Sequence, residues 1–359
     1  MATFERYFRA LVEGERKGKP DRLLLAFLTL LSVPYGFVLS LRAWAYRRGI
    51  LPSHVLGRPV ISVGNLTVGG TGKTPAVAML AKYFISRGKR VAVLSRGYGG
   101  TLRETAVVSD GERLFHSPAE AGDEPYLLAS TVHGLMVVVG VNRWQGGRLA
   151  LERLAPDLFI LDDGFQHLRL KRDLDILLLD SSRPFGNGRT LPGGLLREPR
   201  SAAERADIVI YTRCHDDDEL RHFPGKPSCR AFHHLAGVTL LTGGELHSFE
   251  SLKGLKGVAF AGIADPLSFF RDLEEEGLTL AAALPFPDHC RFGGSDIRLL
   301  MDTFRESGAD YLITTEKDGV KLVQHGNLPG KVYTAVLEMW VADPGPLQSA
   351  LENLLENRG

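Results

Sequence analysis

The chain has 359 residues, of which 44% are hydrophobic and 24% are charged. This composition is typical of a folded protein and excludes a disordered chain, and the length favours two domains over one small core. The formal net charge of +1 indicates no particular partner, and Cys214, Cys229 and Cys290 form neither a disulfide framework nor a zinc motif. We therefore expect a protein of the reducing cytosol.

The first predicted element is an uncharged run of 19 residues, 23–41, between Arg22 and Arg42. Residues 1–48 carry nine Lys and Arg against four Asp and Glu, so positive charge is concentrated at this end of the chain. The run starts too late for a signal peptide and lacks an A-x-A cleavage site. Its length is close to the roughly 20 apolar residues that a spanning helix needs.

Four small or polar residues recur at helical spacing along this run: Thr29, Ser32, Gly36 and Ser40. Three interpretations stay open. We favour a helix that lies in the membrane interface, where its flanking cations meet anionic lipid. The alternatives are a helix packed against the folded domain and a helix that spans the membrane. We assign residues 1–50 to this basic, apolar and membrane-associated segment.

From Pro59 onward, short apolar and β-branched runs alternate with helix-like segments. Runs that are apolar on both faces predict a parallel sheet covered by helices on both sides. The expected strands are PVISV, RVAVLS, LMVVVGV, DLFILDD, LDILLLD, ADIVIYT, GVAFAGI, LTLAAAL, YLITT and VYTAVLEMWV. The expected helices are residues 75–87, 146–154, 266–276, 295–307 and 318–324, and one at the C-terminal end.

The stretch VGNLTVGGTGKTP, residues 63–75, follows the first of these strands and precedes a helix. The strict phosphate-loop pattern is G-x-x-x-x-G-K-[ST], and a threonine stands here in place of its first glycine. Glycines let backbone N–H groups turn toward an anion, and the helix N-terminus adds a favourable dipole. The alternative is a glycine-rich turn with an incidental lysine. The residues expected to bind the nucleotide are Thr67, Val68, Gly69, Gly70, Thr71, Gly72, Lys73 and Thr74.

Within this loop, we expect Lys73 to contact the β- and γ-phosphates of ATP and Thr74 to bind Mg²⁺. Such a nucleotide site needs a carboxylate at the end of a neighbouring strand. The stretch LFILDDGFQH supplies Asp162 and Asp163, as in a Walker B motif, and leaves open which of them touches the metal. The alternative is a strand that ends in a solvated acidic turn. Gln166 either holds water on the metal or caps the strand.

A segment rich in His, Gly and Pro, residues 214–237, interrupts the alternation and predicts a domain junction. The expected fold is therefore α/β: a P-loop NTPase-type parallel sheet covered by helices, a second smaller α/β/α domain, and an N-terminal membrane-associated helix. We place the nucleotide-binding domain at residues 51–225 and the C-terminal domain at residues 226–359.

Seven motifs occur together and in order: VGNLTVGGTGKTP, LSRGYGG, AGDEPYLLA, LDDGFQH, LPGGLLREP, PFPDHCRF and TTEKDGVK. As an ordered set they resemble the tetraacyldisaccharide 4′-kinases, which are membrane-associated enzymes of lipid A synthesis in Gram-negative bacteria. The resemblance covers roughly residues 20 to 325. The phosphate loop of this family has the same form as the one here, so the missing first glycine is no departure from it.

The resemblance implies transfer of the γ-phosphate of ATP to the 4′-hydroxyl of a tetraacylated glucosamine disaccharide 1-phosphate. It also implies two α/β/α domains joined by a short β-linker, with catalysis in the cleft between them. The acyl chains of this acceptor give a kinase a reason to keep an apolar, cation-flanked segment. We therefore expect the protein at the cytoplasmic face of the bacterial inner membrane, with no nucleic acid and no obligate protein partner.

The resemblance also assigns a catalytic pair. Asp123 falls on the catalytic aspartate of the family and His289 on its partner histidine, so Asp123 is expected to accept the proton of the 4′-hydroxyl. From the residues alone, Asp123 would be a helix cap and His289 a loop histidine without a catalytic role. Lys73 completes the expected catalytic set.

Further residues are candidates for substrate binding. Tyr98 belongs to the site by its match to the family. Arg143 and Arg197 could neutralise phosphoryl charge or bind the 1-phosphate, and the alternative is that both are surface arginines. The expected substrate-binding set is Tyr98, Glu124, Arg143, His167 and Arg197.

Two functions of other classes stay open at this point. A switch-type P-loop ATPase or GTPase that drives partner assembly would carry the same loop. A GTPase would usually also need an N/T-K-x-D element, and Glu316 occupies the lysine position of that element in TTEKD. A membrane-anchored nucleotide-binding scaffold would leave Asp123 and His289 without a role.

Overall fold

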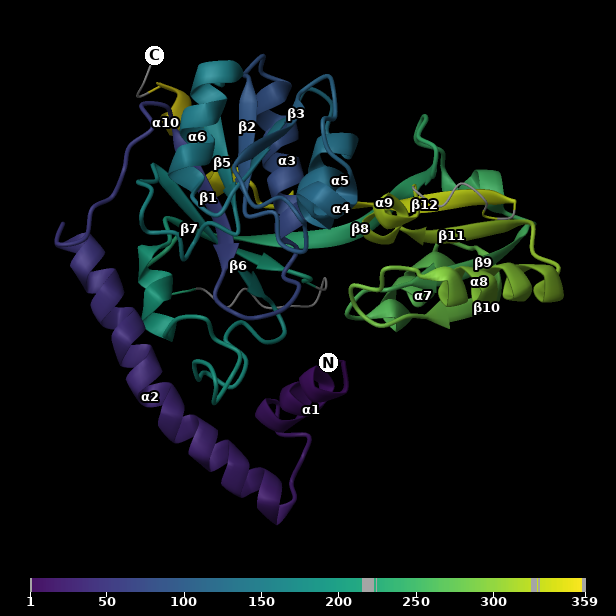
Figure 1. The fold of residues 1–359 in the computed structure, drawn as a ribbon, viewed down its shortest axis with the longest axis horizontal. Helices are drawn as coiled ribbons and strands as arrows, with labels where there is room; N and C mark the ends of the chain where they lie inside the picture. The colour runs from purple at the N-terminus through teal and green to yellow at the C-terminus, as the bar shows by residue number, and fades with distance from the viewer. Residues whose placement is uncertain (1, 215–222, 224, 324–327, 329, 357–359) are drawn as a thin grey trace.

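The computed structural model describes residues 2–214, 223, 225–323, 328 and 330–356. Its strands form one 12-stranded sheet in the order β10-β9-β11-β12-β8-β7-β6-β1-β5-β2-β4-β3. Helices lie on both sides of this sheet, and the strands in the middle of the order join its two halves (Figure 1). The α/β class expected from the sequence is confirmed.

The first half contains the phosphate loop. Its strands are β1 (Val60–Asn65), β2 (Val91–Ser95), β3 (Ala106–Asp110), β4 (Met136–Val139), β5 (Leu158–Asp162), β6 (Leu174–Asp180) and β7 (Ile208–Thr212). Its helices are α3 (Lys73–Ile85), α4 (Pro118–Ala121), α5 (Asp123–Thr131), α6 (Arg143–Arg153) and a 3₁₀ turn, η1 (Arg200–Arg205). All of these strands pair in parallel except β3, which is antiparallel to β4.

Side chains that alternate along a strand point to opposite faces of the sheet, and both faces are buried here. Val91 and Val93 of β2 join one apolar core, whereas Ala92 and Leu94 join the core on the other face. This is why these strands read as continuous apolar runs in the sequence.

The second half contains β8 (Ser228–Leu240), β9 (Lys256–Ala261), β10 (Thr279–Pro285), β11 (Tyr311–Thr315) and β12 (Lys331–Ala342). Its helices are a 3₁₀ turn, η2 (Phe249–Leu252), α7 (Pro266–Glu275), α8 (Gly294–Ser307) and α9 (Glu316–Leu322), and α10 (Gly345–Glu356) follows β12. The helix expected over residues 318–324 corresponds to α9, and residue 324 lies outside the described residues.

The two longest strands, β8 and β12, connect the halves. They run antiparallel from the pair Tyr333 and Leu240 to the pair Ala342 and Arg230, and the start of β8 also pairs in parallel with β7. After β12 the chain returns to the first half, where Leu347 and Leu351 of α10 join the core of β1 and β2. The domain boundary expected at residue 226 therefore stays a prediction.

The N-terminal segment forms α1 (Ala2–Val12) and α2 (Lys19–Arg47). Within the described part of the chain, α2 alone is long and apolar enough to cross a membrane, judged by length and composition. Figure 1 shows it at the outer side of the first half, away from the sheet. Its large apolar residues are exposed, among them Leu23 (74%), Leu30 (68%) and Phe37 (67%).

The narrow stripe of small and polar residues on α2 contacts the loop of residues 187–199. The Thr190 hydroxyl donates a hydrogen bond to the Ser32 carbonyl (3.0 Å), and Arg189 donates one to the Thr29 hydroxyl (3.0 Å). A Cβ atom at Gly193 would lie 2.7 Å from the Thr29 Cα, so only glycine fits this approach. The stripe thus attaches α2 to the first half and leaves its apolar surface uncovered.

Candidate active site

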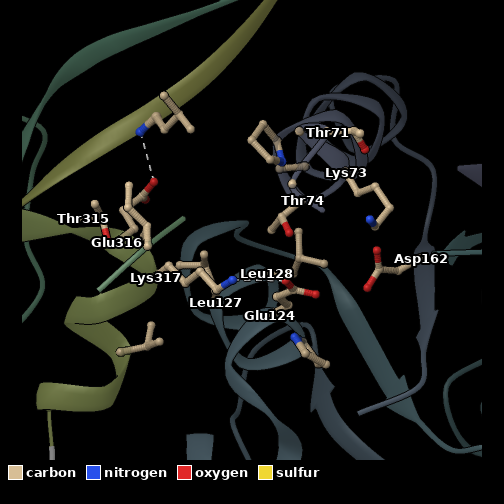
Figure 2. A pocket seen from close by; sticks show the side chains of 18 of the residues that line it. Thr71, Lys73, Thr74, Glu124, Leu127, Leu128, Asp162, Thr315, Glu316 and Lys317 are labelled. Atoms are coloured by element: carbon tan, nitrogen blue, oxygen red, sulfur yellow. Dashed lines mark hydrogen bonds and ion pairs between the residues drawn. The ribbon is translucent and has the colours of Figure 1, made fainter. Parts of the chain in front are cut away.

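A cavity of about 1990 Å³ lies between the two halves. The phosphate loop, the ends of β2 and β5, and α5 line it from the first half, and β8, β12 and α9 line it from the second. In Figure 2, Lys73, Thr74 and Asp162 lie on one side of this space, with Glu124 of α5 between them and Lys317 of α9. The cavity therefore places the candidate nucleotide site opposite charged side chains from both halves.

The phosphate loop connects β1 to α3. Gly72 has a φ of 74° at the start of α3, and a Cβ there would lie 2.5 Å from the His233 Nε2, so both conformation and space require glycine. The Lys73 ammonium lies 3.3 Å from the Asn65 Oδ1 and 3.7 Å from the Asp163 Oδ1. The Lys73 side chain thus extends across the loop to the end of β1, and phosphates bound by the loop would lie beside it.

The two aspartates after β5 have different partners. Arg197 holds both carboxylate oxygens of Asp163, at 2.9 and 2.7 Å. Burial works against ionisation of Asp163, but Lys73 and Arg197 outweigh it and lower the pKa of this carboxyl. The negative charge of Asp163 is therefore already compensated by the side chains of Lys73 and Arg197.

The Asp162 carboxylate is fully buried, and its negative charge is less well compensated than that of Asp163. The Ser95 hydroxyl donates to its Oδ2 at 2.9 Å, while its Oδ1 is buried without a hydrogen-bond partner. Burial, followed by the charge of Glu124, raises the pKa of Asp162 to about 6. A buried carboxylate oxygen without a partner is destabilised, and a cation would relieve this. The donor set fits Mg²⁺.

No cluster of three or more His, Cys, Asp or Glu side chains that could hold a metal occurs among the described residues. Mg²⁺ is usually bound by one or two carboxylates together with phosphates and water. Gln166 donates from its amide to the Asn65 carbonyl (2.9 Å), which fixes it beside the phosphate loop.

Arg143 and His167 are held inside the site, not on the surface. Arg143 is only 6% exposed, its Nε has no hydrogen-bond partner, and burial lowers its pKa although Asp162 and Asp163 act in the opposite direction. Burial, followed by the charge of Arg143, lowers the pKa of His167 to about 4. His167 is therefore a neutral side chain at pH 7.

The structure does not bring Asp123 and His289 into contact. Asp123 begins α5, and its Oδ2 lies 3.8 Å from the Lys321 ammonium. His289 lies in the loop after β10 with a φ of 58°, and its side chain is half exposed at the cavity. Glu124, next to Asp123, pairs with Lys317 at 3.4 Å.

Three cavity residues near the phosphate loop carried no recognisable signal in the sequence. Arg9 of α1 and Arg213 after β7 lie beside Gly69 and Gly70, and His233 of β8 covers Gly72. Burial, followed by the charge of Arg213, lowers the pKa of His233 to about 4. Their proximity to the loop is a property of the tertiary structure, because none of them belongs to a motif.

Comparisons with known proteins agree with a nucleotide-binding site in this cavity. The model of the LpxK family, tetraacyldisaccharide-1-P 4′-kinase, matches residues 24–356. The chain belongs to this family. It is 59% identical to a tetraacyldisaccharide 4′-kinase of Geobacter metallireducens, over 93% of this chain and 99% of that one. It is 56% identical to the protein of the same name from Geobacter sulfurreducens, over 97% and 99%.

Among solved structures, the "apo" form of LpxK from Aquifex aeolicus in complex with ATP is similar to this protein over most of the chain. The TM-score is 0.81 at 36% identity, and the match covers 92% of this chain and 99% of that chain. The family resemblance expected from the seven motifs is confirmed, and so is the conclusion that the protein is an enzyme, a kinase. Membership of this family argues against the switch-type ATPase or GTPase and against the scaffold.

Proposed function

We propose that this kinase transfers the γ-phosphate of ATP to the 4′-hydroxyl of a tetraacylated glucosamine disaccharide 1-phosphate, at the cytoplasmic face of the bacterial inner membrane. One observation carries the proposal: the phosphate loop and the buried Asp162 share a single large cavity with charged residues of α5 and α9. The names of the similar kinases supply the acceptor, and the ATP complex of the Aquifex aeolicus protein supplies the donor.

The nucleotide side of the reaction needs positioning and charge neutralisation more than covalent chemistry. The phosphate loop would bind the phosphates through its backbone N–H groups, with Lys73 beside the β- and γ-phosphates. Mg²⁺, when bound, would neutralise charge that develops on the phosphoryl oxygens. Thr74 and the unpartnered Oδ1 of Asp162 are the groups we assign to it, and Gln166 would orient water around it.

Between the two aspartates, the hydrogen bonds favour Asp162 as the direct metal ligand. Asp163 accepts two hydrogen bonds from Arg197 and lies near Lys73, so its charge is already compensated. We assign Asp163 to positioning Lys73 and Arg197 beside the phosphates. Arg197 and the buried Arg143 would then stabilise the charge of the phosphoryl group during its transfer.

On the acceptor side, Asp123 would take the proton of the 4′-hydroxyl as the new oxygen–phosphorus bond forms and ADP leaves. His289 would pair with Asp123 once the loop that carries it moves toward α5. We assign Tyr98, Glu124 and His167 to contacts with the disaccharide.

The exposed apolar residues of α2 support the placement at a membrane surface. The middle of α2 is attached to the loop of residues 187–199 through Thr29, Ser32 and Gly36. A helix that spans the bilayer would carry this polar loop into the hydrocarbon, where unpaired backbone groups are costly. A helix that lies in the interface keeps the loop in water, so we propose the interfacial arrangement.

The decisive experiment is an incubation of the purified protein with ATP, Mg²⁺ and a tetraacyl disaccharide 1-phosphate. A new phosphomonoester at the 4′ position, seen by mass spectrometry and ³¹P NMR, is the expected result. Lys73→Ala should abolish it with an unchanged circular dichroism spectrum, because Lys73 stabilises charge and lies outside the apolar cores. Phosphorylation at another position, or full activity of Lys73→Ala, would contradict the proposal.

A further inference from the structure

The motif TTEKDGVK had no assigned chemistry in the sequence, and the structure gives its last lysine a place. Lys321 lies in α9, its side chain is 7% exposed, and its ammonium donates to the Asp318 Oδ1 at 2.9 Å. The same ammonium lies 3.8 Å from the Asp123 Oδ2 of the other half. A buried ammonium thus joins two carboxylates from different halves of the molecule.

Asp318 is rigidly held, so the position of Lys321 is fixed. The Asp318 carboxylate is fully buried, and its Oδ2 accepts hydrogen bonds from the Gly262 N–H (2.8 Å) and the Thr315 hydroxyl (2.9 Å). The Asp318 N–H in turn donates to the Thr315 hydroxyl oxygen (3.1 Å), which caps α9. Every partner of this carboxylate comes from a well-packed part of the second half.

The same network reaches the loop of the proposed histidine. The Gly262 carbonyl accepts the backbone N–H of His289 at 3.1 Å, while the Gly262 N–H binds Asp318. A continuous path of contacts therefore leads from His289 through Gly262, Asp318 and Lys321 to Asp123. It connects the two members of the proposed catalytic pair, whose side chains do not touch.

A second ion pair supports the contact between the two helices. Lys317, one turn before Lys321, lies 3.4 Å from the Glu124 carboxylate, and Figure 2 shows these two side chains next to each other. Two neighbouring cations of α9 thus face two neighbouring carboxylates of α5. Charge complementarity of this kind fixes the register of one surface on the other.

We propose that Lys321 is a positioning residue, which fixes the place of the Asp123 carboxylate where the two halves meet. Asp318 and Gly262 fix Lys321 in turn, and they couple it to the His289 loop. The inference rests on the proposed role of Asp123 as the base.

The test replaces the ion pair without leaving a buried charge. Lys321→Gln alone would leave Asp318 buried and uncompensated, which is destabilising enough to endanger folding. The double variant Lys321→Gln/Asp318→Asn keeps neutral hydrogen-bonding groups in the same places and removes the cation beside Asp123. We expect its kcat to fall by about ten- to a hundredfold, because a misplaced catalytic group loses about this much. The KM for ATP should change little.

Two readouts separate positioning from a merely structural role. The KM for the acylated acceptor should change less than kcat in the double variant, because the change displaces the base and leaves the rest of the site in place. Lys321→Arg, which keeps the ion pair with Asp123, should retain most of the kcat of the parent enzyme. The control is Lys253→Gln, which breaks the exposed i,i+3 pair with Glu250 in the same half and should leave kcat unchanged.

A background variant distinguishes failure of this inference from failure of the proposed function. In Asp123→Asn, the Lys321→Gln/Asp318→Asn change should cause no further loss of kcat. If Asp123→Asn is inactive and the double variant has the kcat of the parent, the positioning role of Lys321 is wrong and the base stands. If Asp123→Asn keeps full activity, the base assignment is wrong and the inference is overturned with it.

Discussion

At the scale of single residues, the active site depends on a carboxylate that the fold destabilises. Asp162 is buried beside Glu124 and Asp163, and its Oδ1 has no partner. Such a group lowers the stability of the free protein and becomes favourable when a cation binds. Functional sites commonly carry this conflict between stability and activity.

The first prediction concerns Asp162→Asn, which should inactivate the kinase and stabilise the fold. The pKa of Asp162 is raised from 3.8 to about 6, so the folded state holds this proton more tightly than the unfolded state. The ionised carboxylate therefore destabilises the fold, fully above about pH 6 and not at all below about pH 4. The variant should gain on the order of 1–3 kcal/mol at pH 7.5, with no gain near pH 4.

Urea denaturation in EDTA at both pH values measures this difference. Addition of Mg²⁺ and ATP should stabilise the parent protein strongly and the variant weakly, since binding to the folded state adds to stability. A variant that is equally destabilised at both pH values would show that the raised pKa of Asp162 is not the dominant effect.

The second prediction concerns the proposed pair of Asp123 and His289. Asp123→Ala should lower kcat by about 10²–10⁴-fold, the usual effect of losing a general base, with little change in ATP affinity. His289→Ala should cost the same or less. The double variant should fall well short of the product of the two losses, because residues that act as a unit are not additive.

This cycle is informative because the two side chains are apart in the structure. Steady-state kinetics of the four proteins at saturating ATP measure it. Fully multiplicative losses would mean that the two residues act independently, and His289 would then be a residue that positions substrate.

At the scale of elements, the sequence predicted most strands and helices because their apolar periods are strong. The helix expected from residue 75, where a proline suits the first turn, begins at Lys73 because left-handed Gly72 already starts the turn. The strands β3 and β8 were missed. β3 is a short, half-buried edge strand with a weak pattern, and β8 lies largely in the His-, Gly- and Pro-rich segment that we assigned to a domain junction. α1 was missed as well, because we treated residues 1–50 as one basic, apolar segment and did not separate the amphipathic helix at its start.

The candidate site could be predicted only as far as its motifs reach. The phosphate loop and the acidic pair are local signals, so both were found. The difference between Asp162 and Asp163 depends on Arg197, and the place of Lys321 depends on a contact with Asp123 nearly 200 residues away. Such contacts have no local signature, which is why Lys321, His233 and Arg213 were not foreseen.

The third prediction separates the two surfaces of α2. Leu30→Asp/Phe37→Asp introduces charge on the exposed apolar surface and leaves the docking stripe of Thr29, Ser32 and Gly36 intact. The protein should move from the membrane fraction to the soluble fraction and lose activity on acylated acceptor, because charge on this surface opposes burial in lipid. Deletion of residues 1–45 should have the same effect, and ATP binding should survive in both.

Flotation with anionic vesicles and an ATP-binding assay measure these outcomes. The matched control is Leu267→Asp/Leu299→Asp, which charges two exposed leucines of the second half. It should float like the parent protein. If Leu30→Asp/Phe37→Asp still floats, α2 is not the main membrane anchor.

At the scale of the whole molecule, the chain leaves the first half and returns to it. β8 carries it out, β12 carries it back, and α10 packs against the first core. The nucleotide-binding half is thus completed by the last helix of the chain, although the sequence places that helix after the second half.

The fourth prediction follows from this path. Leu351→Ala should lower the free energy of unfolding by about 2–5 kcal/mol, the usual range for a buried leucine, because Leu351 is 2% exposed in the first core. Leu267→Ala, at a 63% exposed position, should have little effect. Thermal unfolding with and without ATP checks both, and an unchanged midpoint for Leu351→Ala would mean that α10 is not part of the first core in solution.

The loop of residues 187–199 contacts α2 at Thr190 and the acidic pair at Arg197, so one short segment joins the outer helix to the reacting groups. An enzyme held flat on a bilayer by α2 would search for its acceptor by lateral diffusion in two dimensions. Its rate would then follow the mole fraction of acceptor within the surface and would fall as inert detergent or lipid dilutes that surface. The height of the catalytic groups above the lipid would be set by the length of this loop.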